Sequence, residues 1–322
     1  MTTVTAQTPL ESTFAGMGTQ ITLRLWPADE KAERASRALA RERAFLRRAE
    51  ALLSRFRPDS EISQINTAKG KPVRVSPLTL AAVAAARDAA EATAGLFDPT
   101  VYSALLAAGY HRDFATVAAL APASARPAAP QRWQAGRWRE IAIDHAQHLI
   151  TLPAGVGLDL GGIAKGWLAD IVAKRLSRFG PALADLGGDI ALRGLPPDGD
   201  LWRIDVEDPR GGVLGTVRLR GGGIATSGTT RRRWQNSATC AAHHIIDPRT
   251  GMPALTDLLA VTVVAPDATT AEVAAKGALL LGSTLGAAAI RSANIAGILV
   301  RQDGKTIVVG ALDWSDARAR AA

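Results

Sequence analysis

The chain has 322 residues, 47% of them hydrophobic, and its 38 Lys and Arg against 30 Asp and Glu give a formal net charge of +8. This length can bury a full hydrophobic core in one large or two modest domains. No uninterrupted apolar run approaches the roughly 20 residues of a membrane-spanning helix, and a single cysteine, Cys240, excludes an internal disulfide and a cysteine-rich zinc site. The basic residues carry no stacking-aromatic or recognition-helix pattern, which argues against nucleic-acid binding.

The amino-terminal sequence MTTVTAQTPLESTF has neither the basic segment nor the apolar segment of an export signal, and it holds no lipid-attachment signal. We therefore expect a cytoplasmic protein. Any partner protein would then be met in the cytoplasm or at the cytoplasmic face of a membrane complex.

The first part of the chain predicts one strand and two helices. Residues 19–26 alternate between polar and apolar side chains like a strand, and residues 28–53 have the pattern of a long basic amphipathic helix. Residues 77–94 predict an alanine-rich helix, because Ser76 followed by proline is a helix start signal. Residues 114–131 are rich in alanine and proline and predict a mobile connection.

The second part is richer in strands. Residues 138–153 predict a hairpin, and the last two apolar runs flank Asp303 and Gly304, a strong two-residue hairpin signal. Residues 267–281 predict a helix. A further helix that packs on a sheet is predicted by apolar residues at helical spacing, namely Leu168, Ile171, Val172, Leu176 and Phe179. Other strand signals lie at 182–186, 201–207, 215–220 and 258–266.

These elements predict an α+β fold with largely antiparallel sheets and flanking helices. We expect a single domain over residues 1–322, with the connection near 114–131 as its mobile part.

The stretch GLDLGGIAKGWLAD, residues 157–170, is the densest motif in the chain. Its glycine spacing does not match the Rossmann fingerprint, and Lys165 is not followed by the Ser or Thr of a Walker loop. Adjacent glycines before a helix start, with Lys165 close by, nevertheless suit an anion or a nucleotide. Residues 184–192 repeat the pattern of a carboxylate and paired glycines. The alternative for either stretch is a tight turn that needs glycine for its backbone alone.

Two more polar clusters follow. Residues 224–230, IATSGTT, predict a loop of small residues at the end of a strand, and residues 243–253, HHIIDPRTGMP, combine histidines, an aspartate and a turn. Because side chains alternate along a strand, only one of His243 and His244 can face a given side. Ser227 does not lie in the nucleophile elbow of a hydrolase, so we set that activity aside.

In order along the chain, these motifs resemble the ApbE family of FAD:protein FMN transferases, also called flavin transferases. The resemblance covers nearly the whole chain through eight colinear motifs. They are GMGT (16–19), SRFRPDSEISQIN (54–66), GLFDPTV (95–101), LDLGGIAKGWLAD (158–170), ADLGGDI (184–190), IATSG (224–228), HHIIDPRTGMP (243–253) and VTVVAPDATTAEVAAKGALLLG (261–282).

The resemblance implies an ApbE-like, T-fold-like architecture and phosphoryl-type chemistry. Family members bind FAD and attach FMN to a threonine of an acceptor protein, with release of AMP and with magnesium at the phosphates; some hydrolyse FAD instead. Such a reaction requires positioning and charge neutralisation. By the resemblance, His244 is the catalytic base and Gly162 offers its carbonyl to the metal. The positions that match FAD contacts of the family are Met17, Phe56, Leu96, Phe97, Asp98, Asp159, Lys165 and Leu259.

The sequence departs from the family at the metal site. The family pattern places an Asp and a Thr four residues apart, and Glu272 and Lys276 stand there in this chain. Glutamate can still bind a hard cation, but the ammonium of lysine has only donors and repels a metal. We therefore expect an altered site, in which Lys276 pairs with Glu272 and supplies positive charge, and magnesium becomes doubtful. The alternative is a surface ion pair worth about 0.2–0.5 kcal/mol.

Three functions follow from the resemblance. The first is an FMN transferase with an altered metal site, the second is a non-catalytic FAD-binding protein, and the third is an FAD pyrophosphatase. An acceptor protein with a flavinylated threonine would be the partner of the first.

Overall fold

A computed structural model of the chain describes residues 8–119, 133–196, 199–237 and 240–317. The chain divides into two compact units. The first unit comprises residues 1–47, 165–228 and 257–322, and the second comprises residues 48–164 and 229–256. The expectation of a single domain over residues 1–322 stays a prediction.

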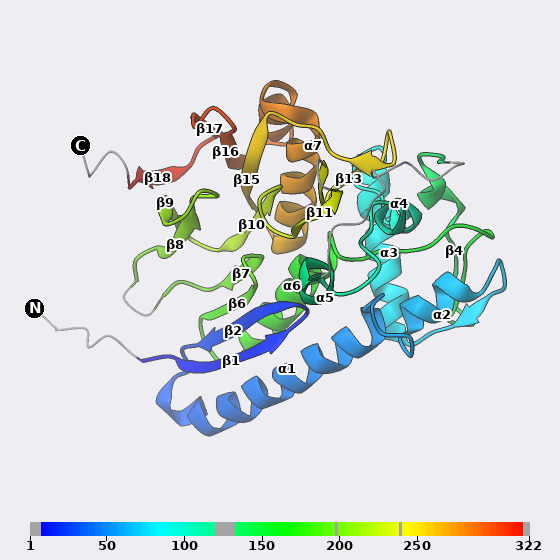
Figure 1. Cartoon of the computed structure of the whole chain (residues 1–322). Coiled ribbons are helices and arrows are strands. Elements are labelled where there is room, and N and C mark those ends of the chain that lie inside the picture. The colour runs from blue at the N-terminus through cyan, green and yellow to red at the C-terminus, as the bar shows by residue number, and fades with distance from the viewer. Residues whose placement is uncertain (1–7, 120–132, 197–198, 238–239, 318–322) are drawn as a thin grey trace, which may run out of the picture. The chain divides into compact units, whose positions relative to one another are not determined.

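The first unit contains an eight-stranded sheet in which every neighbouring pair is antiparallel (Figure 1). Strands that are distant in the sequence are neighbours in it: β2 pairs with β6, so that Leu23 lies opposite Ala184. In spatial order the strands are β1 (Leu10–Gly16), β2 (Thr19–Leu25), β6 (Ala182–Leu186), β7 (Ile190–Arg193), β10 (Gly222–Gly228), β15 (Leu258–Ala265), β16 (Ala296–Arg301) and β17 (Thr306–Val309).

A three-stranded sheet packs on this large sheet within the same unit. It consists of β8 (Trp202–Glu207), β9 (Val213–Leu219) and β18 (Asp313–Asp316). Alternate residues of β8 are buried, as expected for a strand with one face in the core. The shared core contains Leu183, Leu192, Ile224, Ile298, Trp202, Ile204 and Val217.

The helices of the first unit are α6 (Ala164–Leu176), α7 (Ala268–Ser292) and most of α1 (Ala32–Leu53), which follows the short η1 (Asp29–Lys31). Helix α7 packs against β10, β15 and β16. Glycine permits this close approach, since a Cβ on Gly297 would lie 3.0 Å from the Ile290 side chain. Helix α1 runs along the β1–β2 hairpin (Figure 1), and the Arg43 guanidinium lies 5.1 Å from the Phe14 ring centre.

Helix α7 is interrupted at Gly282, whose backbone angles are φ 76° and ψ 178°. Asp257 caps the segment that follows, because its carboxylate accepts hydrogen bonds from the Ser283 amide (2.8 Å) and hydroxyl (2.5 Å). Among the described residues, α7 is the one helix long and apolar enough to cross a membrane, with a mean hydropathy of 1.6, but 56% of that window is buried in the structure. A buried core helix passes the same test.

The second unit combines short helices with three small antiparallel sheets. Its helices are α2 (Glu61–Thr67), α3 (Pro77–Ala92), α4 (Tyr102–Ala107), α5 (Phe114–Ala119) and η2 (Arg137–Glu140). The sheets are formed by β3 (Val73–Arg74), β5 (Leu149–Thr151) and β4 (Ala142–Asp144); by β11 (Arg233–Ser237) and β12 (Cys240–His243); and by β13 (Ile246–Asp247) and β14 (Met252–Pro253). Its core includes Leu105, Tyr110, Trp234 and Ile246.

The α+β class and most predicted elements are confirmed. The hairpin at Asp303 and Gly304 is present, with Gly304 at φ 89° and the Arg301 amide donating to the Lys305 carbonyl. The helix predicted over 77–94 is α3, and its start is capped by Ser76 through the Thr79 amide.

Other expectations were wrong in part. Residues 224–228 are not a loop but the end of β10, because small residues there pair with β15 in the sheet. The strand β1 was missed, helix α6 ends before Phe179, and α7 continues beyond residue 281 after the interruption at Gly282. Of the predicted connection 114–131, residues 114–119 form α5, and the remainder lies outside the described residues.

Candidate functional site

Asp159 lies in a tightly fixed turn of the second unit. Its amide donates to the Pro99 carbonyl (2.8 Å), and its Oδ1 accepts the Gly161 amide (2.9 Å). The preceding residue is bound in both directions by the Asn66 side chain, which donates to the Leu158 carbonyl (2.9 Å) and accepts the Leu158 amide (2.6 Å). The turn therefore places Gly162, which is buried, in a defined position just before α6.

Phe56 is a partly exposed aromatic ring in the same unit. It keeps 38% of its surface exposed and packs edge-on against Tyr110, with ring centres 5.5 Å apart. Tyr110 in turn stacks on Trp234 at 5.1 Å, and burial raises the pKa of the Tyr110 hydroxyl. An exposed ring on a rigid aromatic base offers a stacking surface for a planar ligand.

The predicted segment Leu96–Asp98 combines buried and accessible residues. Phe97 and Asp98 are buried, and Leu96 is half-buried. The Asp98 carboxylate accepts hydrogen bonds from the Thr100 amide (2.7 Å), the Thr100 hydroxyl (2.5 Å) and the Gly136 amide (3.3 Å). Burial raises the pKa of Asp98 despite these donors. The carboxylate is therefore held in one orientation.

The two histidines of the HHIIDPRTGMP motif have different environments. The His243 ring links the end of β12 to the residue after β14, since Nε2 lies 3.1 Å from the Ala254 carbonyl and Nδ1 accepts the Ile245 amide at 3.3 Å. Burial lowers the pKa of His243, so the neutral ring is favoured. His244 is half-buried and lies between β12 and β13. His243 thus holds residues 243–254 together through its ring, and the role of catalytic base stays a prediction for His244.

Lys165 forms a buried charge cluster with two carboxylates in the first unit. Its ammonium pairs with the carboxylate of Asp189 and lies 3.4 Å from Glu272 Oε1, while Glu272 Oε2 accepts the Gly166 amide at 2.8 Å. The side chains of Asp189 and Glu272 are only 3% and 6% exposed. Asp189 belongs to the 184–192 repeat of the carboxylate and glycine pattern, so the sequence signal was present although the residue was not singled out.

Glu272 is buried, which bears on the predicted surface ion pair with Lys276 and on the predicted metal site. A solvent-exposed Glu272–Lys276 surface pair is wrong, because Glu272 is 4% exposed. One Glu272 oxygen is engaged by a backbone amide and the other faces an ammonium, and Lys276 brings no oxygen where the family has a threonine. Among the described residues, no group of three or more His, Cys, Asp or Glu could hold a metal ion. For Glu272 to bind a metal ion, its oxygens would have to leave the Gly166 amide and the Lys165 ammonium.

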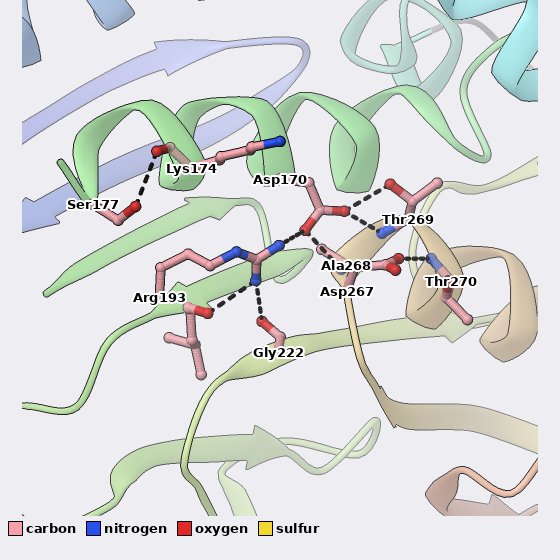
Figure 2. A network of polar contacts seen from close by, with 10 residues as sticks. Asp170, Lys174, Ser177, Arg193, Gly222, Asp267, Ala268, Thr269 and Thr270 are labelled. Atoms are coloured by element: carbon pink, nitrogen blue, oxygen red, sulfur yellow. Dashed lines mark hydrogen bonds and ion pairs between the residues drawn. The ribbon is translucent and has the colours of Figure 1, made fainter.

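The close approach of α6 and α7 sets this cluster. A Cβ on Gly166 would lie 2.5 Å from the Ala268 carbonyl oxygen, so only glycine permits the observed contact. Figure 2 shows how Asp170 of α6 caps the first turn of α7: it accepts the Ala268 amide (3.1 Å) and the Thr269 amide (2.9 Å) and pairs with Arg193 (3.0 Å). Asp170 lies inside the predicted motif, but its partner 98 residues away could not be inferred from spacing.

Met17 and Leu259, the remaining predicted positions, lie at irregular points of the large sheet. Met17 (φ 53°) and Gly18 (φ 68°) form the two-residue turn between β1 and β2. Leu259 lies at a register shift of β15, where a bulge changes the direction of a side chain. With Lys165 they belong to the first unit, whereas Phe56, Leu96–Asp98, Asp159 and His244 belong to the second.

Comparison with known proteins gives one consistent result. The model of the ApbE family matches residues 17–299. The FAD:protein FMN transferase of Treponema pallidum is 32% identical over 264 residues, covering 77% of this chain and 72% of the relative. A protein of the same name from Klebsiella pneumoniae is 31% identical over 286 residues, covering 85% and 83%. The ApbE protein of Thermotoga maritima has a similar structure, with a TM-score of 0.79 and 25% identity over 94% of this chain and 97% of that one.

Proposed function

The chain belongs to the ApbE family, and from this we propose that it is an FAD:protein FMN transferase. The observation that carries the proposal is the family match over residues 17–299, together with relatives of that name that align over more than two thirds of their length. In the proposed reaction the threonine hydroxyl of an acceptor protein attacks the FMN phosphorus of FAD. A new phosphoester bond forms, the bond to the AMP oxygen breaks, and AMP leaves.

We propose these roles for residues of the chain by the resemblance. His244 accepts the proton of the incoming hydroxyl. Phe56 offers a ring face to the ligand, and the fixed carboxylates of Asp98 and Asp159 bind its polar groups. Lys165 brings positive charge near the diphosphate, where phosphoryl transfer needs charge neutralisation more than covalent catalysis.

The proposal includes an altered metal site. Its support is the state of Glu272, whose two oxygens are engaged by the Gly166 amide and the Lys165 ammonium. Lys276 lies one helical turn further along α7 and adds a second positive charge. We propose that these ammonium groups supply the positive charge that a metal ion, bound in part by a threonine hydroxyl, supplies in other members of the family.

The same observation favours a second candidate, an FAD-binding protein that has lost catalysis. The ammonium groups of Lys165 and Lys276 are held by the fold and cannot follow the charge that develops during transfer as a divalent ion can. This favours binding of FAD without transfer. A third candidate, FAD hydrolysis to FMN and AMP, is separated by its products alone.

The test is an assay with purified protein, FAD and a flavin-acceptor domain, each with added magnesium and with a chelator. A fluorescent acceptor band with stoichiometric AMP is the expected result. Retained FAD without AMP over hours would contradict transfer and support the second candidate, and FMN with AMP but without a labelled acceptor would identify hydrolysis.

The variant Lys276→Thr tests the altered metal site. It should raise the rate with magnesium and make that rate sensitive to the chelator, because a hydroxyl replaces a repelling ammonium. The control is Lys174→Thr, an exposed lysine of α6. An unchanged response of Lys276→Thr to magnesium would contradict this part of the proposal.

A further inference from the structure

Arg55 is a buried arginine of the second unit, and neither the motif analysis nor the family resemblance gives it a role. Its side chain is 3% exposed. Nε donates to Asp159 Oδ2 at 2.5 Å, and Nη1 donates to the Tyr110 carbonyl at 2.9 Å. A buried arginine needs such partners, because an uncompensated buried charge is strongly unfavourable.

Aromatic rings surround the same guanidinium. Its central carbon lies 4.1 Å from the ring centre of Phe56, 4.7 Å from that of Tyr110 and 5.7 Å from that of Tyr102. Within the described part of the chain, the buried Nη2 has no hydrogen-bond partner. The ring faces therefore provide the remaining favourable contact of this group. A lysine could not reproduce this arrangement, since its ammonium lacks the planar shape that stacks on a ring.

One side chain thus links two positions that the family resemblance assigns to FAD. Arg55 contacts the inner face of the exposed Phe56 ring and holds the Asp159 carboxylate, whose other oxygen accepts the Gly161 amide. The Phe56 ring contacts the Arg55 guanidinium, the guanidinium pairs with the Asp159 carboxylate, and this carboxylate accepts the Gly161 amide of the turn. The guanidinium therefore contacts both the Phe56 ring and the Asp159 carboxylate at the same time.

We propose that Arg55 is a positioning residue that holds Phe56 and Asp159 as one preformed surface for the flavin dinucleotide. This inference rests on the proposed function. It adds that affinity for FAD depends on a residue that acts through its neighbours. Preorganisation of this kind lowers the conformational entropy that binding would otherwise cost.

The test is the affinity for FAD, measured by isothermal titration calorimetry, of Arg55→Lys. This variant keeps a positive charge that can pair with Asp159. It loses the planar guanidinium that stacks on the rings and the second N–H donor, which binds the Tyr110 carbonyl. We expect the dissociation constant to rise roughly tenfold, which is 1.4 kcal/mol. The loss of buried contacts should also lower the melting temperature, so the titration is done at a temperature at which circular dichroism shows the variant to be folded. Arg57→Lys is the matched control, since Arg57 is exposed and pairs only loosely with Asp59 at 3.4 Å; its affinity should be unchanged.

A double-mutant cycle with Phe56→Ala shows whether Arg55 acts through the ring. In the Phe56→Ala background, Arg55→Lys should weaken FAD binding by clearly less than it does in the wild type. Fully independent losses would overturn the proposal, and so would a loss of melting temperature without a loss of affinity. If Arg55→Lys does not fold, Arg55→Gln, which keeps a planar hydrogen-bonding group but not the charge, is measured in its place, and an unchanged affinity for FAD would overturn the proposal.

The affinities of the wild type and the variant test the proposed function and the role of Arg55 separately. Wild-type protein without affinity for FAD would remove the proposed function itself. Wild-type affinity for FAD that Arg55→Lys leaves intact would remove only the role of Arg55.

Discussion

Lys165 is the residue at which the stability of the fold and the proposed function meet. Its ammonium is the partner of two carboxylates that are almost fully buried, Asp189 and Glu272. Removing the cation would leave two almost fully buried carboxylates without their counterion, which is strongly destabilising. The same ammonium is the positive charge that we propose for the diphosphate of FAD, so ligand binding must compete with or extend this cluster.

The variant Lys165→Met should lower the free energy of unfolding by about 3–5 kcal/mol, because it leaves buried charge uncompensated. Urea unfolding followed by circular dichroism measures this change. The control is Lys174→Met on the same helix, at an exposed position, which should change stability by less than about 0.5 kcal/mol. Equal losses for the two variants would contradict the assignment of Lys165 as a buried counterion.

His243 gives a pH-dependent prediction. Burial, with a smaller contribution from Arg233, lowers its pKa from the ordinary 6.5. When the pH falls below 6.5, the unfolded chain therefore binds a proton at this residue before the folded protein does. The stabilisation from the neutral ring is fully present above that pH and is lost as the pH falls through the lowered pKa of the folded state.

The variant His243→Gln should therefore lose less stability between pH 7.5 and pH 5 than the wild type, although it is less stable at pH 7.5. Denaturant unfolding at several pH values checks the difference in slope. His145→Gln, at an exposed position, should keep the wild-type slope. A steeper slope for His243→Gln would show that the sign assigned to His243 is wrong.

At the scale of elements, helix α7 shows what sequence patterns can and cannot predict. The periodicity predicted a helix over 267–281, and a regular segment ends there because Gly282 leaves helical geometry. The continuation to Ser292 was missed, since its start depends on Asp257, which precedes it by 26 residues and caps Ser283. Local patterns predict a helix, whereas a cap from a distant strand end is set by tertiary structure.

The candidate site follows the same rule. Lys165, Asp159 and Glu272 were predicted because they lie in motifs with a recognisable order, and their roles stay predictions. Arg55 was missed although it lies inside the motif of residues 54–66, because its role depends on a contact with Asp159, 104 residues away. Residue type and spacing identify groups that carry chemistry, and the contacts that hold them are fixed only by the fold.

The interruption of α7 determines whether Gly282→Ala destabilises or stabilises the protein, so this substitution tests it. At φ 76° and ψ 178°, Gly282 occupies a region that side chains disfavour, so Gly282→Ala should destabilise the protein by about 1–3 kcal/mol. In an uninterrupted helix the same change would stabilise by roughly 0.5–1 kcal/mol. Urea unfolding of the two proteins decides between these signs, and a stabilised variant would exclude the interruption.

At the scale of the molecule, the order of motifs carried more information than any one of them. The eight-stranded sheet pairs β2 with β6 and β7 with β10, and periodicity alone contains no rule that makes these strands neighbours. The predicted strands and helices indicated the α+β class, and the eight colinear motifs predicted the family. The positions that the resemblance assigns to FAD are spread over the described parts of both units.

Binding of FAD should therefore raise the stability of the whole protein. A ligand that binds only the native state adds about 2.7 kcal/mol at a concentration of 100 times its dissociation constant. The melting temperature, followed by differential scanning calorimetry, should rise steadily with the logarithm of the FAD concentration, and AMP or riboflavin alone should give smaller shifts, because each makes only part of the contacts. If FAD stabilised one calorimetric transition and left a second unchanged, its contacts would be confined to part of the chain. The assignment of FAD contacts both to Met17, in the first unit, and to Phe56, in the second, would then be wrong for one of them.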